Sequence, residues 1–184
     1  GCVYPLVPVE SGGSLETDKP DPVGEYAQSC LGRERLFEFG SNQNKTHVSL
    51  IRLNYAVEMR YGVFVDIALK VKNKLPVDLS MGFFNVIWQG DANDVVLRSL
   101  ELVASPAGIL NITGPEILSV REVALQFGKL FGVKPEFIGT EAKTALAIAV
   151  ADVSGAAPLA SPTFTGTPAA PTAAADTSTT QIAT

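Results

Sequence analysis

Histidine and cysteine are scarce in this chain, and their scarcity excludes several kinds of site. His47 is the only histidine among 184 residues, so a histidine-based zinc site is excluded. A Ser-His-Asp triad would have to use His47, which opens a β-rich run and is expected to be a surface residue. Cys2 and Cys30 are the only cysteines and no C-x-x-C occurs. Two thiols cannot build a disulfide framework, which favours a reducing, cytoplasmic setting.

Long apolar runs and basic runs are also missing. The longest apolar run, 145–151, is far shorter than the roughly 20 residues that cross a bilayer. The first residues, from Gly1 to Pro5, lack the charged and apolar regions of a signal peptide. The formal net charge is −5 and no Lys/Arg-rich run occurs, which argues against a nucleic-acid-binding face. We therefore expect neither a membrane nor a nucleic acid as a partner.

Glycine-rich phosphate-binding motifs are absent as well. The chain contains neither G-x-G-x-x-G nor G-x-x-x-x-G-K-[ST], and the pair Gly12-Gly13 stands alone. Such glycines let the backbone approach a pyrophosphate closely at a strand-to-helix turn. By itself, the chain is not expected to bind a dinucleotide well.

Regular periodicity, by contrast, is present through the first three quarters of the chain. Apolar spacing predicts helices over 25–39, 62–74, 91–103 and 120–131, and strands over 48–53, 84–88, 109–112 and 135–138. Ser119 and Glu122 form a capping box, and Gly132 is placed to end that helix. Asp91 is expected to cap the helix that it opens. The alternation of helices and strands predicts an α/β fold.

Five segments follow one another in an order that is typical of a known family. They are Val3–Pro5, Asp21–Tyr26, Leu50–Asn54, Val86–Asp91 and Leu110–Glu122. This order resembles the C-terminal part of the extended short-chain dehydrogenases, the NAD(P)-dependent epimerase/dehydratase family that acts on nucleotide sugars. The resemblance covers about 1–143, and 110–131 is its most specific tract. It implies an incomplete Rossmann-like fold with a small substrate-binding subdomain, NAD or NADP as cofactor, a nucleotide-sugar substrate and a dimer.

The family's catalytic motif is only partly preserved. In the family a Tyr opens a helix in a Y-x-x-x-K motif and moves a proton, while the Lys lowers its pKa. Tyr26 matches the Tyr, but Cys30 stands at the Lys position. The side chain of a free tyrosine has a pKa of about 10. A nearby cation favours the phenolate, whereas a neutral thiol does not. The alternative for Tyr26 is an aromatic residue that packs the helix against the sheet.

Other implied positions are less specific. The resemblance places the catalytic Ser/Thr and the glycine-rich half before Val3, so the chain alone is expected to be inactive. Asn54 and Tyr55 lie near the place of a substrate-facing Asn, and Trp88 near a residue of the substrate pocket. Core packing explains Trp88 at least as well. No metal site is predicted.

The composition changes near residue 145, which divides the chain into an enzyme-like domain, 1–145, and a tail, 146–184. The tract 151–184 holds 10 Ala, 8 Thr and 4 Pro, with no Lys or Arg, and is expected to be low-complexity and mostly irregular. Its 160–168 phrase, ASPTFTGTP, resembles bacteriophage tail-fibre segments, which implies a structural role, a trimer and a virion tail. Two alternatives therefore stay open: a structural fibre-related protein, or a chimeric sequence joined near 143–153.

Overall fold

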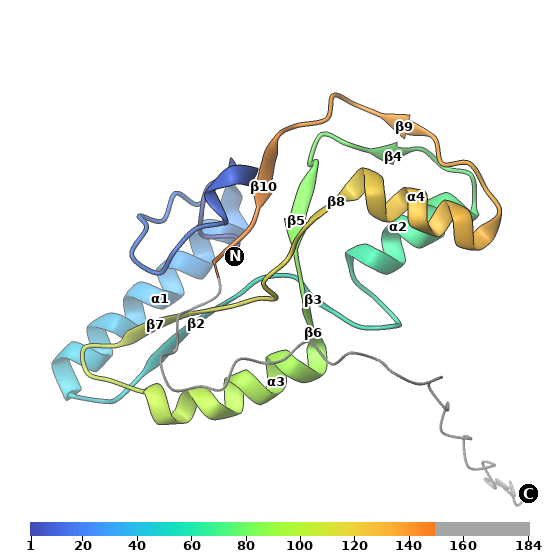
Figure 1. Ribbon diagram of the computed structural model, residues 1–184. Coiled ribbons are helices and arrows are strands. Elements are labelled where there is room, and N and C mark those ends of the chain that lie inside the picture. Colours follow the sequence, from blue (N-terminus) through green and yellow to red (C-terminus); the bar gives the residue numbers. More distant parts are fainter. Residues whose placement is uncertain (150–184) are drawn as a thin grey trace, which may run out of the picture. The chain divides into compact units, whose positions relative to one another are not determined.

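Helices and strands alternate along the chain in the computed structural model, which describes residues 1–149 (Figure 1). The α-helices are α1 (Gly24–Asn44), α2 (Val63–Lys72), α3 (Gln89–Arg98) and α4 (Val120–Phe131), and the 3-10 turns are η1 (Val9–Ser11) and η2 (Ser99–Leu102). The strands are β1 (Val7–Pro8), β2 (Ser49–Leu53), β3 (Ala56–Val57), β4 (Val77–Asp78), β5 (Phe83–Asn85), β6 (Ile87–Trp88), β7 (Gly108–Ile112), β8 (Ile117–Ser119), β9 (Phe137–Ile138) and β10 (Thr144–Leu146). The predicted α/β class is confirmed.

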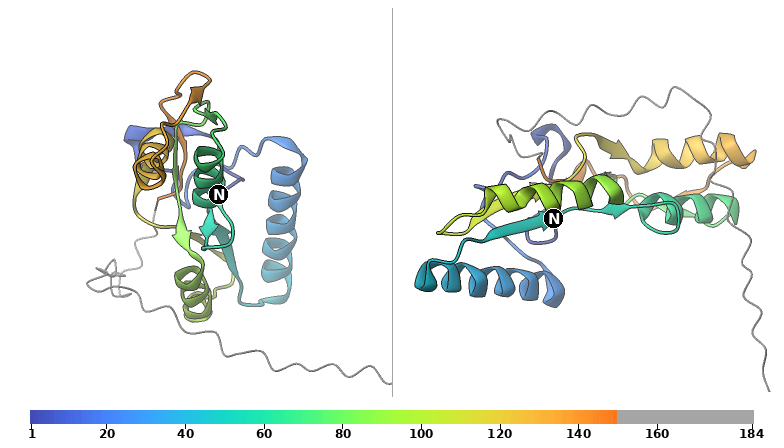
Figure 2. Two further views of the ribbon diagram at one scale, coloured as in Figure 1. Left: turned by 90° about the vertical axis from the view of Figure 1, so that its right-hand side faces the viewer. Right: turned by 90° about the horizontal axis from the view of Figure 1, so that it is seen from below.

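Strands β2 and β7 form a parallel pair that is five residues long. Leu50 lies opposite Ile109 and Leu53 opposite Ile112. Parallel strands need a crossover connection, which the chain supplies through α2 and α3. Figures 1 and 2 show α1 and α3 on opposite sides of this pair. A parallel pair flanked by helices is the Rossmann-like part of the predicted fold.

The remaining strands are short and form a mixed arrangement. A four-stranded sheet has the order β1-β10-β5-β8, in which β10 and β5 are parallel and the other two pairings are antiparallel. Two further parallel pairs are β3–β6 and β4–β9. The four-stranded sheet therefore joins the N-terminal loop to the last described strand.

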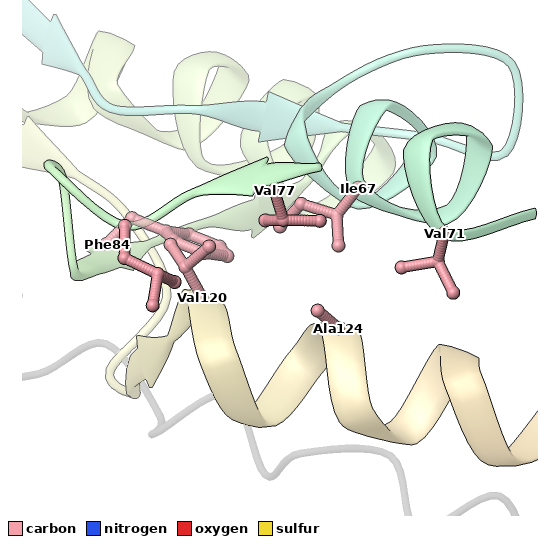
Figure 3. Close-up of a cluster of buried hydrophobic side chains, with 7 residues drawn as sticks. Ile67, Val71, Val77, Phe84, Val120 and Ala124 are labelled. Carbon is pink, nitrogen blue, oxygen red and sulfur yellow. The ribbon is translucent and has the colours of Figure 1, made fainter. Parts of the chain in front are cut away.

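A core of apolar side chains lies between α2, α4 and the strands β4 and β5 (Figure 3). Ile67 and Val71 of α2 face Ala124 of α4, which is fully buried. Phe84 of β5 extends this core, and its ring meets that of Phe64 edge to face with centroids 5.9 Å apart. Burying each such Val, Ile or Phe side chain stabilises the fold by about 1.5–3 kcal/mol.

Helix α4 has the ends that its sequence predicts. The Ser119 hydroxyl accepts a hydrogen bond from the Glu122 amide at 3.3 Å, as expected of the capping box. Gly132 ends the helix with a φ of 66°, in the left-handed region that favours glycine. Gly128 lies so close to Pro135 that a Cβ atom would come within 2.7 Å of the proline ring. A glycine is therefore needed for the chain to fold back along α4.

Several predicted boundaries differ from the structure. Helix α1 continues to Asn44, past the end predicted near residue 39. The predicted strand 84–88 is two strands on either side of Val86, because β5 pairs with β10 and β8 whereas β6 pairs with β3. Asp91 does not cap α3: the helix begins at Gln89, so Asp91 already lies within its first turn. The sequence alone could not show that α3 begins directly after a strand.

The described part of the chain runs past the predicted domain boundary at residue 145. Strand β10 continues to Leu146, and Ala147 and Ile148 are buried. The boundary itself stays a prediction, and the tail-like tract that follows lies outside the described residues. No helix among residues 1–149 is both long and apolar enough to cross a membrane.

Candidate functional site

Tyr26 lies in the first turn of α1, as the motif requires. Gly24, with a φ of 82°, turns the chain into the helix after Val23. The Tyr26 side chain is 75% exposed, which does not fit the alternative of an aromatic packed against the sheet. The side chain is therefore accessible to a second molecule.

Cys30 lies one turn further along α1 and is buried. It packs in a small cluster with Val3, Tyr4 and Ile148, and Cys2 lies against the same cluster. The cluster joins the N-terminal turn, α1 and the segment that follows β10. Cys30 therefore fills the space at the Lys position with a small, uncharged side chain.

The thiols affect the ionisation of Tyr26 in the direction opposite to a lysine. A side-chain hydrogen bond with Cys30 is the largest influence and raises the pKa of Tyr26. The charge that Cys30 or Cys2 would carry as a thiolate adds to this effect, whereas Arg33 opposes it. The net effect favours the neutral phenol, so less of Tyr26 is ionised at a given pH than beside a cation.

A buried polar network fixes the N-terminal turn beside this helix. The Tyr4 hydroxyl accepts a hydrogen bond from the Arg52 guanidinium of β2 and donates one of 3.0 Å to Asn111 of β7. The guanidinium also lies over the Tyr4 ring, 4.8 Å from its centroid. Burial is the main cause that raises the pKa of Tyr4, while Arg52 lowers it. Tyr4 thus links the N-terminal turn to the paired strands β2 and β7.

The same network reaches α1 and the loop before it. Arg52 donates from two nitrogens to the carboxylate of Glu34, at 2.8 to 3.2 Å. The side-chain nitrogen of Asn111 donates to the Ser14 carbonyl, and the backbone N–H of Asn111 donates to the Glu16 carboxylate. Sequence reasoning singled out neither Tyr4 nor Glu34. An arginine inside an apolar strand was the available signal, because a buried guanidinium requires partners.

Asn54 is buried at the carboxyl end of β2. Its side-chain nitrogen donates to the backbone oxygen of Asn85 at 3.1 Å and to the Asn85 side-chain oxygen. Asn85 in turn donates to the carbonyl of Ile148 at 2.7 Å. This pair of amides holds the segment after β10 against β2 and β5. The observed contacts give Asn54 a structural role, and its predicted substrate contact stays a prediction.

Tyr55 and Trp88 lie at neighbouring strands and are both partly exposed. Trp88 ends β6, which pairs with β3, and Tyr55 directly precedes β3. The Ile87 amide donates to the Tyr55 carbonyl at 3.1 Å, which keeps the two segments together. Burial raises the pKa of Tyr55. Their predicted place near a substrate stays a prediction.

Hollows in the surface do not coincide with these residues. One of ≈ 200 Å³ lies at the C-terminal half of α1, lined by Leu36, Phe37 and Ser41 among others. A second of ≈ 380 Å³ lies beyond α4, beside Gly132 and Pro135. Neither is lined by Tyr26, Cys30, Asn54, Tyr55 or Trp88.

The two turns that lead directly from a strand into a helix do not offer a pyrophosphate site. The turn from β8 into α4 offers only the Ser119 hydroxyl, which already accepts from Glu122. The turn from β6 into α3 has Trp88 at its N-cap. Neither has the open glycines that a pyrophosphate needs. No group of three or more His, Cys, Asp or Glu within residues 1–149 could hold a metal ion.

Comparison with known proteins identifies the fold. No family model and no curated protein matches the chain. Solved structures do match, among them the UDP-glucose 4-epimerase of Thermus thermophilus in complex with NAD, at a TM-score of 0.62 and 20% identity over 82% of this chain and 52% of that one. RMD from Pseudomonas aeruginosa, complexed with NADPH, matches at 0.66 and 19% over 82% and 55%.

A dTDP-glucose 4,6-dehydratase, DesIV from Streptomyces venezuelae, was solved with NAD and TYD bound. It matches at a TM-score of 0.64 and 14% identity, over 82% of this chain and 48% of that one. The chain thus has part of the Rossmann-like fold of the extended short-chain dehydrogenases, and it spans about half the length of these neighbours. The resemblance in fold that the sequence predicted is confirmed.

Proposed function

We propose that the chain is the C-terminal part of an NAD(P)-dependent enzyme that epimerises or dehydrates a nucleotide sugar. The observation that carries the proposal is the exposed phenol of Tyr26 in the first turn of α1, on a fold shared with such enzymes over about four fifths of the chain. In this proposal, Tyr26 exchanges a proton with a sugar hydroxyl or carbonyl.

A buried polar group supports the idea that further residues belong against this fold. The Thr113 hydroxyl, directly after the carboxyl end of β7, is buried and has no hydrogen-bond partner among the described residues. Buried hydroxyls are nearly always satisfied. Ligands of open α/β sheets bind outside the carboxyl ends of the strands, where Thr113 and Asn54 both lie.

The cofactor and substrate that we propose are those of the structural neighbours. Their structures hold NAD or NADPH, and one is a UDP-glucose epimerase and another a dTDP-glucose dehydratase. We propose NAD or NADP and a UDP- or dTDP-linked sugar for the complete enzyme, in the cytoplasm. This chain alone would be inactive, because it lacks a glycine-rich turn and has Cys30 where a lysine would lower the pKa of Tyr26.

The proposal is tested first by the coding DNA upstream of Gly1. A strand followed by G-x-G-x-x-G in the same reading frame is expected. The longer product should quench and shift NADH fluorescence at micromolar concentrations, and Tyr26→Phe should abolish conversion of the sugar nucleotide without weakening NADH binding. A stop codon or an unrelated sequence upstream would overturn the proposal. Micromolar NADH binding by the 184-residue chain would contradict its predicted inability to bind the cofactor.

A second candidate rests on the ASPTFTGTP phrase at 160–168, which lies outside the described residues. We propose, as the alternative, that the chain is a structural protein related to tail fibres, with trimerisation through its C-terminal tract. Sedimentation equilibrium separates the candidates, since a trimer supports the fibre and a dimer the enzyme. A break in genomic reads near 143–153 would instead reveal a chimera.

A further inference from the structure

The C-terminal ends of α2 and α4 lie at the same end of the fold. Figure 3 shows the two helices side by side and running in the same direction, packed through a cluster that includes Val71 of α2 and Ala124 of α4. The chain then continues into β4 and β9, which pair in parallel. The two connections between helix and strand, 73–76 and 132–136, therefore lie at this end as well.

Lysines are concentrated at this end. Five of the eight lysines of the chain lie in the last turns of the two helices or in the connections that follow: Lys70, Lys72, Lys74, Lys129 and Lys134. All five are exposed, and none forms a salt bridge within the part of the chain that the structure describes. Segments 69–78 and 128–138 contain two carboxylates, Asp78 and Glu136, so positive charge is in excess there.

Helix dipoles account for only part of this concentration. A lysine in the last turn of a helix is favoured by the negative end of the dipole, which explains Lys129 and the two lysines within α2. Lys74 and Lys134 lie beyond the helices. Each is three residues before the strand that follows it, and those strands begin opposite each other in the β4–β9 register. The two lysines thus occupy equivalent places in neighbouring connections.

Large apolar side chains are exposed among these lysines. Leu130 follows Lys129 and is 76% exposed, and Leu75 follows Lys74 and is 53% exposed. Phe131, at the end of α4, is also exposed. Apolar side chains beside lysines are typical of surfaces that bind a membrane interface, because the apolar groups enter the headgroup region while the ammonium groups stay at the lipid phosphates.

We propose that these five lysines, together with Leu75, Leu130 and Phe131, form a docking surface for an anionic membrane, here called the lysine end. A cluster of four to eight lysines is about the number that binds anionic lipid surfaces. A nucleic acid would supply negative charge but no apolar phase for the two leucines. A peripheral contact requires no spanning segment, so it agrees with the short apolar runs of the chain.

The lysine end is separate from the residues of the proposed enzyme. Figures 1 and 2 show α1, which carries Tyr26, on the other side of the fold from the ends of α2 and α4. The docking surface stands on its own charges and exposed side chains, and it does not depend on a dinucleotide or a sugar. Loss of vesicle binding and loss of enzymatic conversion are therefore independent results.

The test mixes the full 184-residue chain with vesicles of phosphatidylcholine that contain about 30% phosphatidylserine. The chain should sediment with these vesicles at low salt and stay in the supernatant with pure phosphatidylcholine. It should be released as salt rises to about 0.5 M, because salt screens the lysines. Equal sedimentation with neutral vesicles, or none with anionic ones, would overturn the proposal. Binding to a DNA duplex as tightly as to the vesicles would overturn it too.

Charge variants locate the surface. Lys129→Gln and Lys134→Gln should each weaken binding to the anionic vesicles by about fivefold at low salt. Lys19→Gln is the matched control, because Lys19 is exposed in the N-terminal loop and its loss changes the net charge equally. An equal loss of affinity in the control would show that total charge, and not the lysine end, governs binding.

An apolar variant tests the insertion. Leu130→Ser should weaken vesicle binding while leaving its salt dependence unchanged, because the lysines remain. Leu36→Ser on α1 is the control, since Leu36 is 73% exposed and lies outside the lysine end. Circular dichroism should show both variants folded, as both side chains are exposed. Parental affinity in Leu130→Ser would contradict the insertion of this leucine into the membrane.

Discussion

The guanidinium of Arg52 and the carboxylate of Glu34 form a bidentate ion pair that joins the central strand β2 to the helix α1. The Arg52 side chain is 4% exposed and that of Glu34 13%. Both charges are thus largely removed from water and depend on each other. The pair holds the helix that carries Tyr26 against the strand that ends near Asn54.

Replacing one partner of this pair should be costly. Glu34→Gln leaves the Arg52 charge buried without its counter-ion, so we expect the free energy of unfolding to fall by about 3 kcal/mol. Urea denaturation followed by circular dichroism measures the change. Glu38→Gln on the same helix is the control, because the Arg35–Glu38 pair is exposed and should contribute less than about 1 kcal/mol. Equal losses in the two variants would show that the buried pair has no special weight.

The Tyr4 hydroxyl should contribute to stability through its two buried partners. Tyr4→Phe removes the acceptor of Arg52 and the donor to Asn111, so we expect a loss of about 1–3 kcal/mol. Tyr55→Phe is the control, since the Tyr55 hydroxyl meets only the Met81 sulfur at 3.9 Å in the contacts observed and should change stability little. A Tyr4→Phe variant as stable as the parent would contradict the proposed network.

The raised pKa of Tyr4 predicts how the stability of the fold changes with pH. Burial raises the pKa of Tyr4 above its value in the unfolded chain, so the unfolded state releases the proton first as the pH rises. The unfolded state then binds fewer protons than the folded one, and stability falls with rising pH above about 10. In Tyr4→Phe this part of the alkaline loss should disappear. Urea midpoints measured between pH 8 and 11 would show an unchanged slope if Tyr4 does not contribute.

The core between α2 and α4 should depend on its buried leucine. Leu79 is 1% exposed and belongs to the same cluster as Val77 and Phe84, so Leu79→Ala should cost about 2–5 kcal/mol through lost burial and a cavity. Leu130→Ala on α4 is the control, because Leu130 is 76% exposed and its loss should cost less than about 0.5 kcal/mol. Thermal denaturation should separate the two variants. A small effect of Leu79→Ala would show that the core repacks around the gap.

The sequence was informative where a local rule determines the structure. The apolar run of β2 and the Ser119 cap of α4 depend on neighbouring residues alone, and both are confirmed. The packing of Cys2 against the cluster that contains Cys30 joins distant segments, and so does the link from Glu34 through Arg52 to Tyr4. No local pattern predicts them, because they arise only when α1 packs beside the N-terminal turn. The fold class was thus predictable, whereas the environment of Tyr26 was not.

Cys30 should control the ionisation of Tyr26. Removing its thiol in Cys30→Ala deletes the interaction that most raises the pKa of Tyr26, so we expect a lower pKa. Cys30→Lys should lower the pKa further, because a cation one turn away favours the phenolate. The tyrosinate absorbance, measured against pH with Tyr26→Phe subtracted, isolates this phenol from Tyr4, Tyr55 and Tyr61.

The exposure of Tyr26 sets a limit on these shifts. Because the side chain is 75% exposed, solvent and salt screen the interaction with a charge at position 30. The difference between Cys30→Lys and Cys30→Ala should therefore shrink as salt rises from 0.01 to about 1 M. The Cys30→Ala shift should persist, since a hydrogen bond over one helical turn is little screened. Identical midpoints in the parent and in Cys30→Ala would show that the thiol does not contact the phenol, and the predicted role of Cys30 would then fail.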